Sequence, residues 1–327
     1  LAIGPLIGGL ITERIDWSWI FFVNVPIGVV GLLVGRLVID ESRDTSAEQR
    51  LDLPGLAASA IGLFALTFAL IEANSYGWTD PVIVGLFVLS AVSLVTFVLL
   101  ERHQRSPMLD LSLFRSSTFA GANVVALLVT LAMFGVFFFM SIYMQNILGY
   151  SATKTGAAFL PMTILIILIA PIAGKSSDRI GSRALMTVGM LCLAASLALF
   201  SRLGLDSGFW DILPGLIVGG FGMALVMTPM TAAALGAVPV EKSGVGSGVL
   251  NTFRQVGGAL GIAVMGAIVA SYVDLNGGRP DPSSFIDGFQ AALRVCTGFA
   301  LLGALIAFVT IRKHRHLDAG ELAEVAA

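Results

Sequence analysis

Arg254 is the residue whose type and surroundings point most directly to chemistry. It lies inside the apolar run 246–273, beside Gln255 and one helical turn from Asn251. A charge held away from water is costly, so an ionisable side chain in such a run is a functional candidate. We expect its guanidinium to meet an anionic ligand or a carboxylate of another helix. The alternative is that the side chain extends along the helix to the nearest polar head groups.

A second group of side chains suits the binding of a small amphipathic molecule. These side chains lie in the apolar stretch that starts near Phe119 and combine amide, aromatic and thioether groups: Asn123, Phe137, Met140, Tyr143 and Gln145. Methionine and aromatic side chains adapt to ligands of different shape, and a few polar groups fix the orientation. The pattern predicts a candidate substrate cavity, with burial in the core or exposure to lipid as the alternative.

The sequence does not contain the pattern of residues that catalysis would need. A membrane-embedded transferase, the alternative from another functional class, requires acidic pairs for a metal-bound diphosphate or a His or Glu base. Asp178 has no carboxylate beside it, and Glu241 is paired only with Lys242. Cys192 and Cys296 fall in apolar runs, so neither a disulfide framework nor a zinc site is expected. We therefore expect no enzyme, no metal and no cofactor.

The elements that position these residues follow from the low charge of the chain. Only 12% of the 327 residues are charged, against about 25% in ordinary soluble domains, and 56% are hydrophobic. Such a chain cannot cover itself with polar surface, so the lipid bilayer is the expected surrounding. The net charge of -2 and the lack of a basic patch exclude a nucleic-acid partner.

Long runs with few or no charges predict membrane-spanning helices. A helix needs about 20 apolar residues to cross the hydrocarbon core. Nine runs meet this need: 19–39, 53–71, 81–100, 116–153, 155–174, 184–201, 212–240, 246–273 and 289–311. A tenth run, 1–12, is too short to span, and we expect it to be the tail of a further span whose beginning is missing. The predicted fold class is an all-α multi-pass membrane protein.

The distribution of basic residues predicts the orientation of these spans. If the run 1–12 exits on the outside, the inner connections hold 13 of the 19 basic residues, and the outer loops hold four. Positive residues gather on the cytoplasmic side of membrane proteins. All four Trp then fall at the outer side, which supports the same count of spans. A multi-pass protein of the cell membrane with a cytoplasmic C-terminus is therefore predicted.

Two neighbouring motifs near the start of the chain resemble one family of transporters. The first is the run Gly4, Pro5, Leu6, Ile7, Gly8 and Gly9, in which Gly4 and Gly8 have the spacing that lets helices approach closely. The second is the stretch 17–28, WSWIFFVNVPIG, which opens the next span. Together they resemble the major facilitator superfamily, and within it the fourteen-helix drug:proton antiporter branch of the EmrB/QacA type. In that branch the first run is the antiporter motif that ends helix five.

The resemblance implies a partial major facilitator fold, from the end of helix five to helix fourteen. Residues 1–39 then end the N-terminal six-helix bundle, and residues 40–115 form a linker and an inserted two-helix hairpin. Residues 116–311 form the C-terminal six-helix bundle, and residues 312–327 a cytoplasmic tail. Because the chain starts within a helix and without Met, we expect it to be a C-terminal fragment of a longer transporter.

The stretch 174–183 resembles the second copy of the superfamily's inner gate loop. The matching positions are Gly174, Asp178, Arg179, Gly181 and Arg183. We expect Asp178 near the positive end of a helix dipole, and the two arginines paired with carboxylates or helix C-termini, which would hold the inner gate closed. The alternative is a set of solvated turn charges. The stretch 244–261, which includes Asn251, Arg254 and Gln255, resembles the family's entry into helix thirteen.

The resemblance implies proton-driven efflux of small amphipathic molecules by alternating access between two bundles. The proton gradient would be the energy source. The carboxylate that couples proton movement to transport is expected in helices one to four, which this chain lacks. A dedicated exporter of a lipid, a siderophore or a self-made antibiotic is the alternative within the transporters. Whether a periplasmic adaptor protein takes part is left open.

Overall fold

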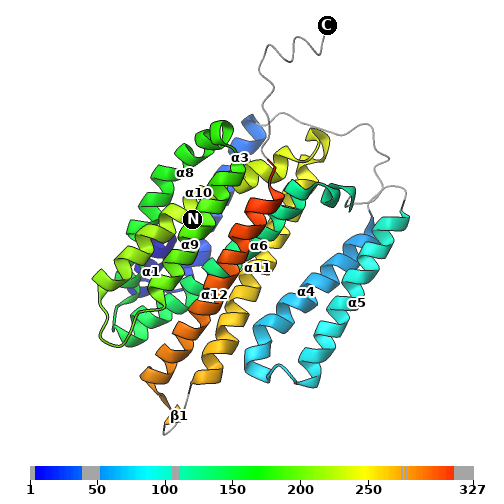
Figure 1. The fold of residues 1–327 in the computed structure, drawn as a ribbon. Helices are drawn as coiled ribbons and strands as arrows, with labels where there is room; N and C mark the ends of the chain where they lie inside the picture. The colour runs from blue at the N-terminus through cyan, green and yellow to red at the C-terminus, as the bar shows by residue number, and fades with distance from the viewer. Residues whose placement is uncertain are drawn as a thin grey trace.

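Long helices run side by side through most of the chain (Figure 1). The computed structural model describes residues 4–38, 52–104, 109, 111–273, 275–276 and 279–312. The predicted linker of the 40–115 segment lies partly outside these residues, and so does the predicted tail beyond Arg312. The side chain of Pro5 is outside them as well.

The elements follow one another in a nearly all-helical order. The helices are α1 (Gly4–Arg14), α2 (Trp19–Phe22), α3 (Asn24–Val38), α4 (Leu53–Tyr76), α5 (Pro81–His103), the 3-10 helix η1 (Leu111–Arg115), α6 (Ser117–Ile142), the π-helix η2 (Tyr143–Ile147), α7 (Ala152–Ala158), α8 (Leu160–Ile180), α9 (Ser182–Phe200), α10 (Phe209–Gly236), the 3-10 helix η3 (Val240–Lys242), α11 (Ser243–Tyr272) and α12 (Pro282–Thr310). Two short antiparallel strands, β1 (Leu275–Asn276) and β2 (Arg279–Pro280), connect α11 to α12.

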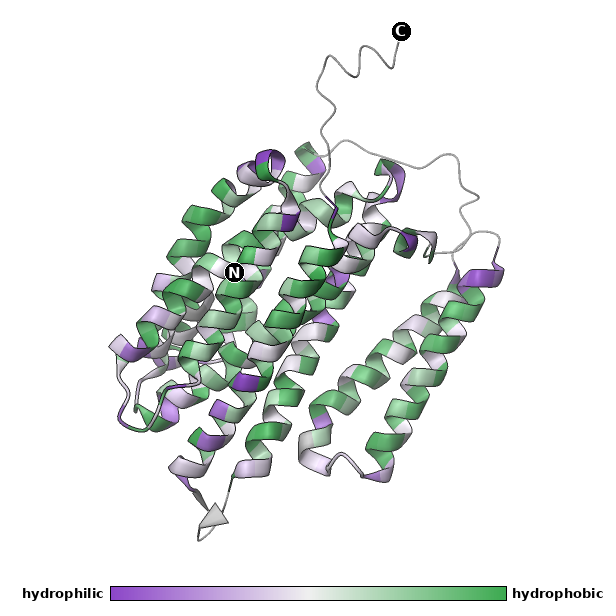
Figure 2. Cartoon of the chain, viewed as in Figure 1, coloured by the Kyte–Doolittle hydropathy of each residue, from purple (hydrophilic) through white to green (hydrophobic). Residues whose placement is uncertain are grey.

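The predicted membrane spans are confirmed. Nine helical stretches among the described residues are long and apolar enough to cross a bilayer, and each overlaps one predicted run. Figure 2 shows hydrophobic residues along the helices and most hydrophilic ones near their ends. The largest differences lie at the fifth span, which continues as α8 to Ile180 rather than ending at residue 174, and at the ninth span, which begins at Pro282 rather than at residue 289.

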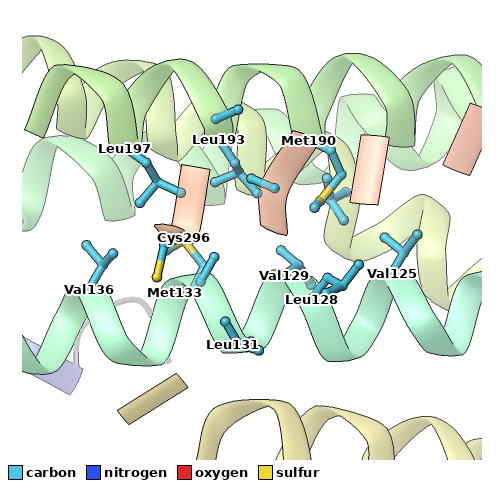
Figure 3. Close-up of a cluster of buried hydrophobic side chains, with 14 of the residues drawn as sticks. Val125, Leu128, Val129, Leu131, Met133, Val136, Met190, Leu193, Leu197 and Cys296 are labelled. Atoms are coloured by element: carbon cyan, nitrogen blue, oxygen red, sulfur yellow. The ribbon is translucent and has the colours of Figure 1, made fainter. Parts of the chain in front are cut away.

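Helix α6 is the centre of the block formed by α6 to α12. A larger share of its residues is buried than in any other described span, and it contacts α10, α11 and α12. Figure 3 shows Val125, Val129 and Val136 of α6 directed toward Met190, Leu193 and Leu197 of α9, with Cys296 of α12 between them, whereas Leu131 of α6 points to the opposite side. These side chains form one continuous core.

Glycines set the spacing of the helices around this core. On α11, a Cβ atom added at Gly257 would overlap the carbonyl oxygen of Leu127, and one added at Gly261 would overlap that of Leu131 on α6. On α9 and α10, Gly189 and Gly222 lie against each other's carbonyl oxygens, at 2.8 and 2.7 Å from the added Cβ atoms. Helices in lipid associate through such close packing of small residues. The block is therefore fixed by backbone contacts.

Helices α4 and α5 form a hairpin beside this block. At one end, the Oδ1 atom of Asp52 accepts hydrogen bonds from the backbone N–H of Gly55 at 2.8 Å and from Nε2 of Gln104 at 2.7 Å. At the turn, Trp78 and Phe87 stack with ring centroids 6.1 Å apart. The hairpin meets the block where α4 contacts α11. Figure 1 shows α5 on the side away from α11.

The glycine contacts predict a large difference between two positions of the same helix. Gly261→Ala places a methyl group against the backbone of α6 and should lower the thermal unfolding temperature, since overpacking costs about 1–3 kcal/mol. Gly248→Ala on α11 meets no described atom within 4 Å and should leave the temperature unchanged or slightly higher. Thermal unfolding of the purified protein measures both. Equal unfolding temperatures for the two variants would contradict the assignment of Gly261 to a close contact between α11 and α6.

Candidate functional site

Arg254 joins two helices in the interior of the membrane-spanning block. It follows eleven residues after the start of α11, and its Nη2 atom donates a hydrogen bond to Oγ1 of Thr231 on α10 at 2.7 Å. The Thr231 hydroxyl donates in turn to the carbonyl of Met227 at 3.1 Å. The Nε atom of Arg254 is buried and has no hydrogen-bond partner among the described residues. The guanidinium therefore holds α10 and keeps an unused donor.

The two polar neighbours of Arg254 do not join it. Asn251 is exposed, and Gln255 is exposed on the side of α11 that faces α4 and the phenyl ring of Phe134. Residues three and four positions apart share one face of a helix, so the three side chains lie on the same side of α11, but the hydrogen bond that reaches another helix is the one from Arg254. Of this predicted group, the structure leaves Arg254 as the residue that links two helices.

The residues of the predicted substrate cavity differ in their surroundings. Met140 and Tyr143 are fully buried in the core, where the Tyr143 hydroxyl donates to the carbonyl of Gly204 at 2.7 Å and its ring stacks on Phe289 at 5.6 Å. Gln145 is exposed. Burial in the core, the alternative for these side chains, is what the structure shows for Met140 and Tyr143. Tyr143 and Gln145 lie beyond α6 in η2, and α6 itself is apolar on all sides, so its sequence does not reveal which face is the core.

Phe137 lies one helical turn before Met140 on α6, and Asn123 lies far from both, near the start of the helix. Phe137 is half-buried and packs against Phe159 of the α7–α8 segment, with ring centroids 5.1 Å apart. Asn123 is fully buried, and its Nδ2 atom donates to the carbonyl of Phe119 at 2.8 Å. Its Oδ1 atom has no hydrogen-bond partner among the described residues. An acceptor inside the block thus stays available near the end of α6 where Ser117 begins the helix.

The predicted inner gate loop is mostly helical. Helix α8 continues through Asp178 and Arg179 to Ile180, and Gly181 alone makes the turn to α9 with a φ of 93°. Asp178 therefore lies in the last turn of α8 rather than in a loop, four residues before α9 begins at Ser182; its position near the positive end of the α9 dipole stays a prediction. Gly181 is what permits this compact turn, because L side chains rarely adopt such a φ.

The arginine that packs in this turn is Arg183. Its guanidinium lies over the ring of Phe308 on α12, 4.2 Å from the ring centroid, which is a cation–π contact. Gly174 approaches Thr228 of α10, with 3.1 Å from an added Cβ to the threonine methyl group. Arg179 is exposed. The motif thus fastens the ends of α8 and α9 to α10 and α12 of the same block.

The predicted antiporter motif lies on α1, and its close contact is made by another glycine than the two expected. Gly4 and Gly8 have no described atom within 4 Å of an added Cβ. The close approach occurs at Gly9, where an added Cβ would overlap the carbonyl oxygen of Ala152 at the start of α7. The motif therefore brings α1 against α7 through the last glycine rather than through the predicted Gly4 and Gly8 pair.

Glu13 strengthens the same contact and was missed by the sequence reasoning. Its Oε2 atom accepts a hydrogen bond from the backbone N–H of Thr153 at 2.8 Å, across 140 residues of sequence. The Thr153 side chain, then its N–H, and then the Ser151 side chain favour the charged carboxylate, so the pKa of Glu13 is lowered from its ordinary value of 4.5. The signal in the sequence is an acidic residue just after the apolar run 1–12 and the polar residues Ser151 and Thr153 at the end of the run 116–153.

Comparisons with known proteins agree on one family of membrane proteins. Residues 1–262 match the family model described as the Major Facilitator Superfamily. Three similar proteins are the puromycin resistance protein of Streptomyces alboniger, at 36% identity over 95% of this chain, the tetracenomycin C resistance and export protein of Streptomyces glaucescens, at 34% over 83%, and the multidrug resistance protein Stp of Mycobacterium tuberculosis, at 33% over 85%. The chain spans 63%, 51% and 53% of their respective lengths.

The contact of Glu13 predicts a defined dependence on pH. Its folded pKa is lowered, so the contact should be complete above about pH 4.5 and lost as the pH falls through the lowered value. Spin labels at Ile15→Cys and Leu148→Cys, with Cys192 and Cys296 replaced by Ala, would report the separation of α1 from α7.

The matched control for this experiment is Asp16→Asn. The Asp16 carboxylate accepts from the backbone N–H of Ser18 at 2.9 Å, within its own segment, so this variant should keep the pH response of the label distance. Glu13→Gln should show little further change on acidification. If the distance between the labels responds to pH equally in the Glu13→Gln variant and in the protein without this substitution, the pH response does not come from the contact of Glu13 with Thr153.

Proposed function

The chain belongs to the major facilitator superfamily, and we propose that the protein exports drugs or related amphipathic small molecules by proton-coupled alternating access. The main support for this proposal is the similarity, over 83–95% of this chain, to three proteins whose names describe resistance or export. The fold is a helical membrane fold of this superfamily, and the multiple apolar spans agree with a multi-pass membrane protein. Transport rather than catalysis is the proposed activity.

Within the superfamily, we place the protein in the fourteen-helix drug:proton antiporter branch. The position of the hairpin supports this placement, because α4 and α5 lie in sequence between α3 and the block of α6 to α12. The proposed location is the cell membrane with the C-terminus in the cytoplasm, which rests on the distribution of basic residues. Proton coupling rests on the resemblance to the branch.

Two contacts have the geometry that alternating access would use. Arg254 and Thr231 connect α11 with α10 inside the block, and the free Nε donor of Arg254 can bind an anionic or carbonyl group of a ligand. Glu13 and Gly9 connect α1 with α7 at the end that the charge distribution assigns to the outside. In this proposal, the first contact responds to the substrate, and the second opens when the outer side opens.

A narrower range of cargo is the second candidate. Two of the three relatives are named for a single antibiotic, puromycin or tetracenomycin C. Those names favour an exporter dedicated to one compound class over one with a broad range. The two candidates share the same fold and mechanism and differ in the number of compounds that drive transport.

Transport assays on the full-length protein test the proposal. In proteoliposomes with an imposed pH gradient, addition of an exported compound should release protons, and the compound should accumulate only while the gradient lasts. A panel that includes puromycin and several unrelated cationic dyes separates the two ranges of cargo. Transport that does not require the pH gradient would overturn proton coupling, and the absence of transport for every compound would overturn drug export.

Arg254 gives the sharpest single-residue prediction. Arg254→Gln should lower the transport rate at least about tenfold, because a hydrogen bond to a charged group contributes about 1.5–3 kcal/mol. Arg294→Gln is the matched control, since Arg294 is exposed and its hydrogen bond within the described part of the chain goes to Gln290 of its own helix, at 3.2 Å. The initial rate of efflux measures both variants at equal protein levels. Equal rates for the two variants would remove Arg254 from the mechanism.

A further inference from the structure

A groove separates the hairpin from α11. It has a volume of about 510 Å³ and is lined from α4 by Ser59 and Leu63, from α5 by Phe97, and from α11 by Gly248 and Thr252. Farther along the same seam, a second groove of about 420 Å³ lies between α4 and α11. Figure 1 shows the hairpin beside α11 along this seam. The contact of the hairpin with the block is thus interrupted by space that a ligand can fill.

The wall of the first groove offers no free hydroxyl group at Ser59 or Thr252. The Ser59 hydroxyl donates to the carbonyl of Leu56 at 3.0 Å, and the Thr252 hydroxyl donates to the carbonyl of Gly248 at 3.0 Å. Both hydroxyls are therefore satisfied within their own helices. The helices on either side are membrane spans, so the molecules that reach the groove come from the lipid phase. An apolar chain fits this wall better than a polar group.

The length of the groove corresponds to one leaflet of the bilayer. Its lining on α11 extends from Gly244 to Phe253. At about 1.5 Å per residue, these positions cover about 15 Å of helix. The hydrocarbon core of a bilayer is about 30 Å thick, so one leaflet contributes about 15 Å. A single acyl chain that enters from one side would lie along this part of α11.

Basic residues lie close in sequence to the lining residues at one end of the groove. Exposed Arg102 is in the last turn of α5, five residues after the lining residue Phe97, exposed Arg115 follows the lining residue Phe114, and exposed Lys242 lies two residues before the lining residue Gly244. On the acidic side, Glu241 is exposed, whereas Glu101 is buried and accepts a hydrogen bond from the N–H of Leu109 at 3.1 Å. Among the described residues at this end, the exposed charges are therefore mainly positive.

We propose that this groove binds one phospholipid with an anionic head group, whose acyl chain lies between the hairpin and α11. The apolar wall recognises the chain, and Arg102, Arg115 and Lys242 recognise the phosphate. The bound lipid would complete the packing of the hairpin against α11. The inference concerns lipid binding and does not rest on drug export or on proton coupling.

Native mass spectrometry of the purified full-length protein tests the proposal. With added phosphatidylglycerol, the protein should retain one lipid that withstands removal of the detergent. Gly248→Leu should raise the apparent dissociation constant at least tenfold, because no described atom lies within 4 Å of an added Cβ and the new side chain enters the groove. Gly85→Leu is the matched control on the hairpin, since Gly85 is exposed, has the same free space and does not line the groove.

Further variants separate the head group from the chain. Arg115→Gln combined with Lys242→Gln should abolish the preference for phosphatidylglycerol over phosphatidylcholine. The Phe97→Trp variant places a fluorescent side chain in the wall of the groove without blocking it. Its tryptophan fluorescence should be quenched more strongly by phosphatidylglycerol with brominated chains than by phosphatidylcholine with brominated chains.

Three outcomes would overturn the proposal. The first is equal retention of the lipid by Gly248→Leu and Gly85→Leu. The second is equal binding of the two lipid classes by the unsubstituted protein. The third is displacement of the lipid by puromycin in a competitive manner, which would make the groove a drug site instead.

Discussion

Close backbone contact at glycines is the constraint on which the structure depends. Lipid chains are as apolar as leucine, so burial of apolar side chains does not by itself bring membrane helices together. Gly257 and Gly261 bring α11 against α6, and Gly189 and Gly222 bring α9 against α10. The first pair also sets the place of Arg254, three residues before Gly257. A shift of α11 along α6 would move the guanidinium away from Thr231.

The spans could be predicted from the sequence because a bilayer imposes one simple requirement. A stretch without charges must be long enough to cross, and the chain meets this nine times within the described residues. The ends of the spans were harder to predict. Lys175 and Asp178 lie in helix α8, although their charges suggested a loop. Composition cannot separate a helix that continues beyond the hydrocarbon core from a polar turn.

The candidate site could be predicted only in part. Arg254 was found because a charge within an apolar run is conspicuous, but its partner Thr231 lies on another helix and has no such signal. Glu13 was missed for the same reason, since its contact with Thr153 joins residues far apart in sequence. In α6, the faces of the helix cannot be told apart by pattern. Met140 and Tyr143 therefore looked as suitable for a cavity as for the core in which they lie.

The distribution of tight and loose contacts indicates which parts can move as bodies. Helices α6, α9, α10, α11 and α12 share one core and several glycine contacts, so a change among them would cost many interactions at once. The hairpin meets this block along a seam that contains two grooves, and α1 meets it through Gly9 and Glu13 at the start of α7. A transition between two shapes should preserve the block and change these two boundaries. The contact of Glu13 with Thr153 and the grooves beside α11 are then the features that link the block to α1 and to the hairpin.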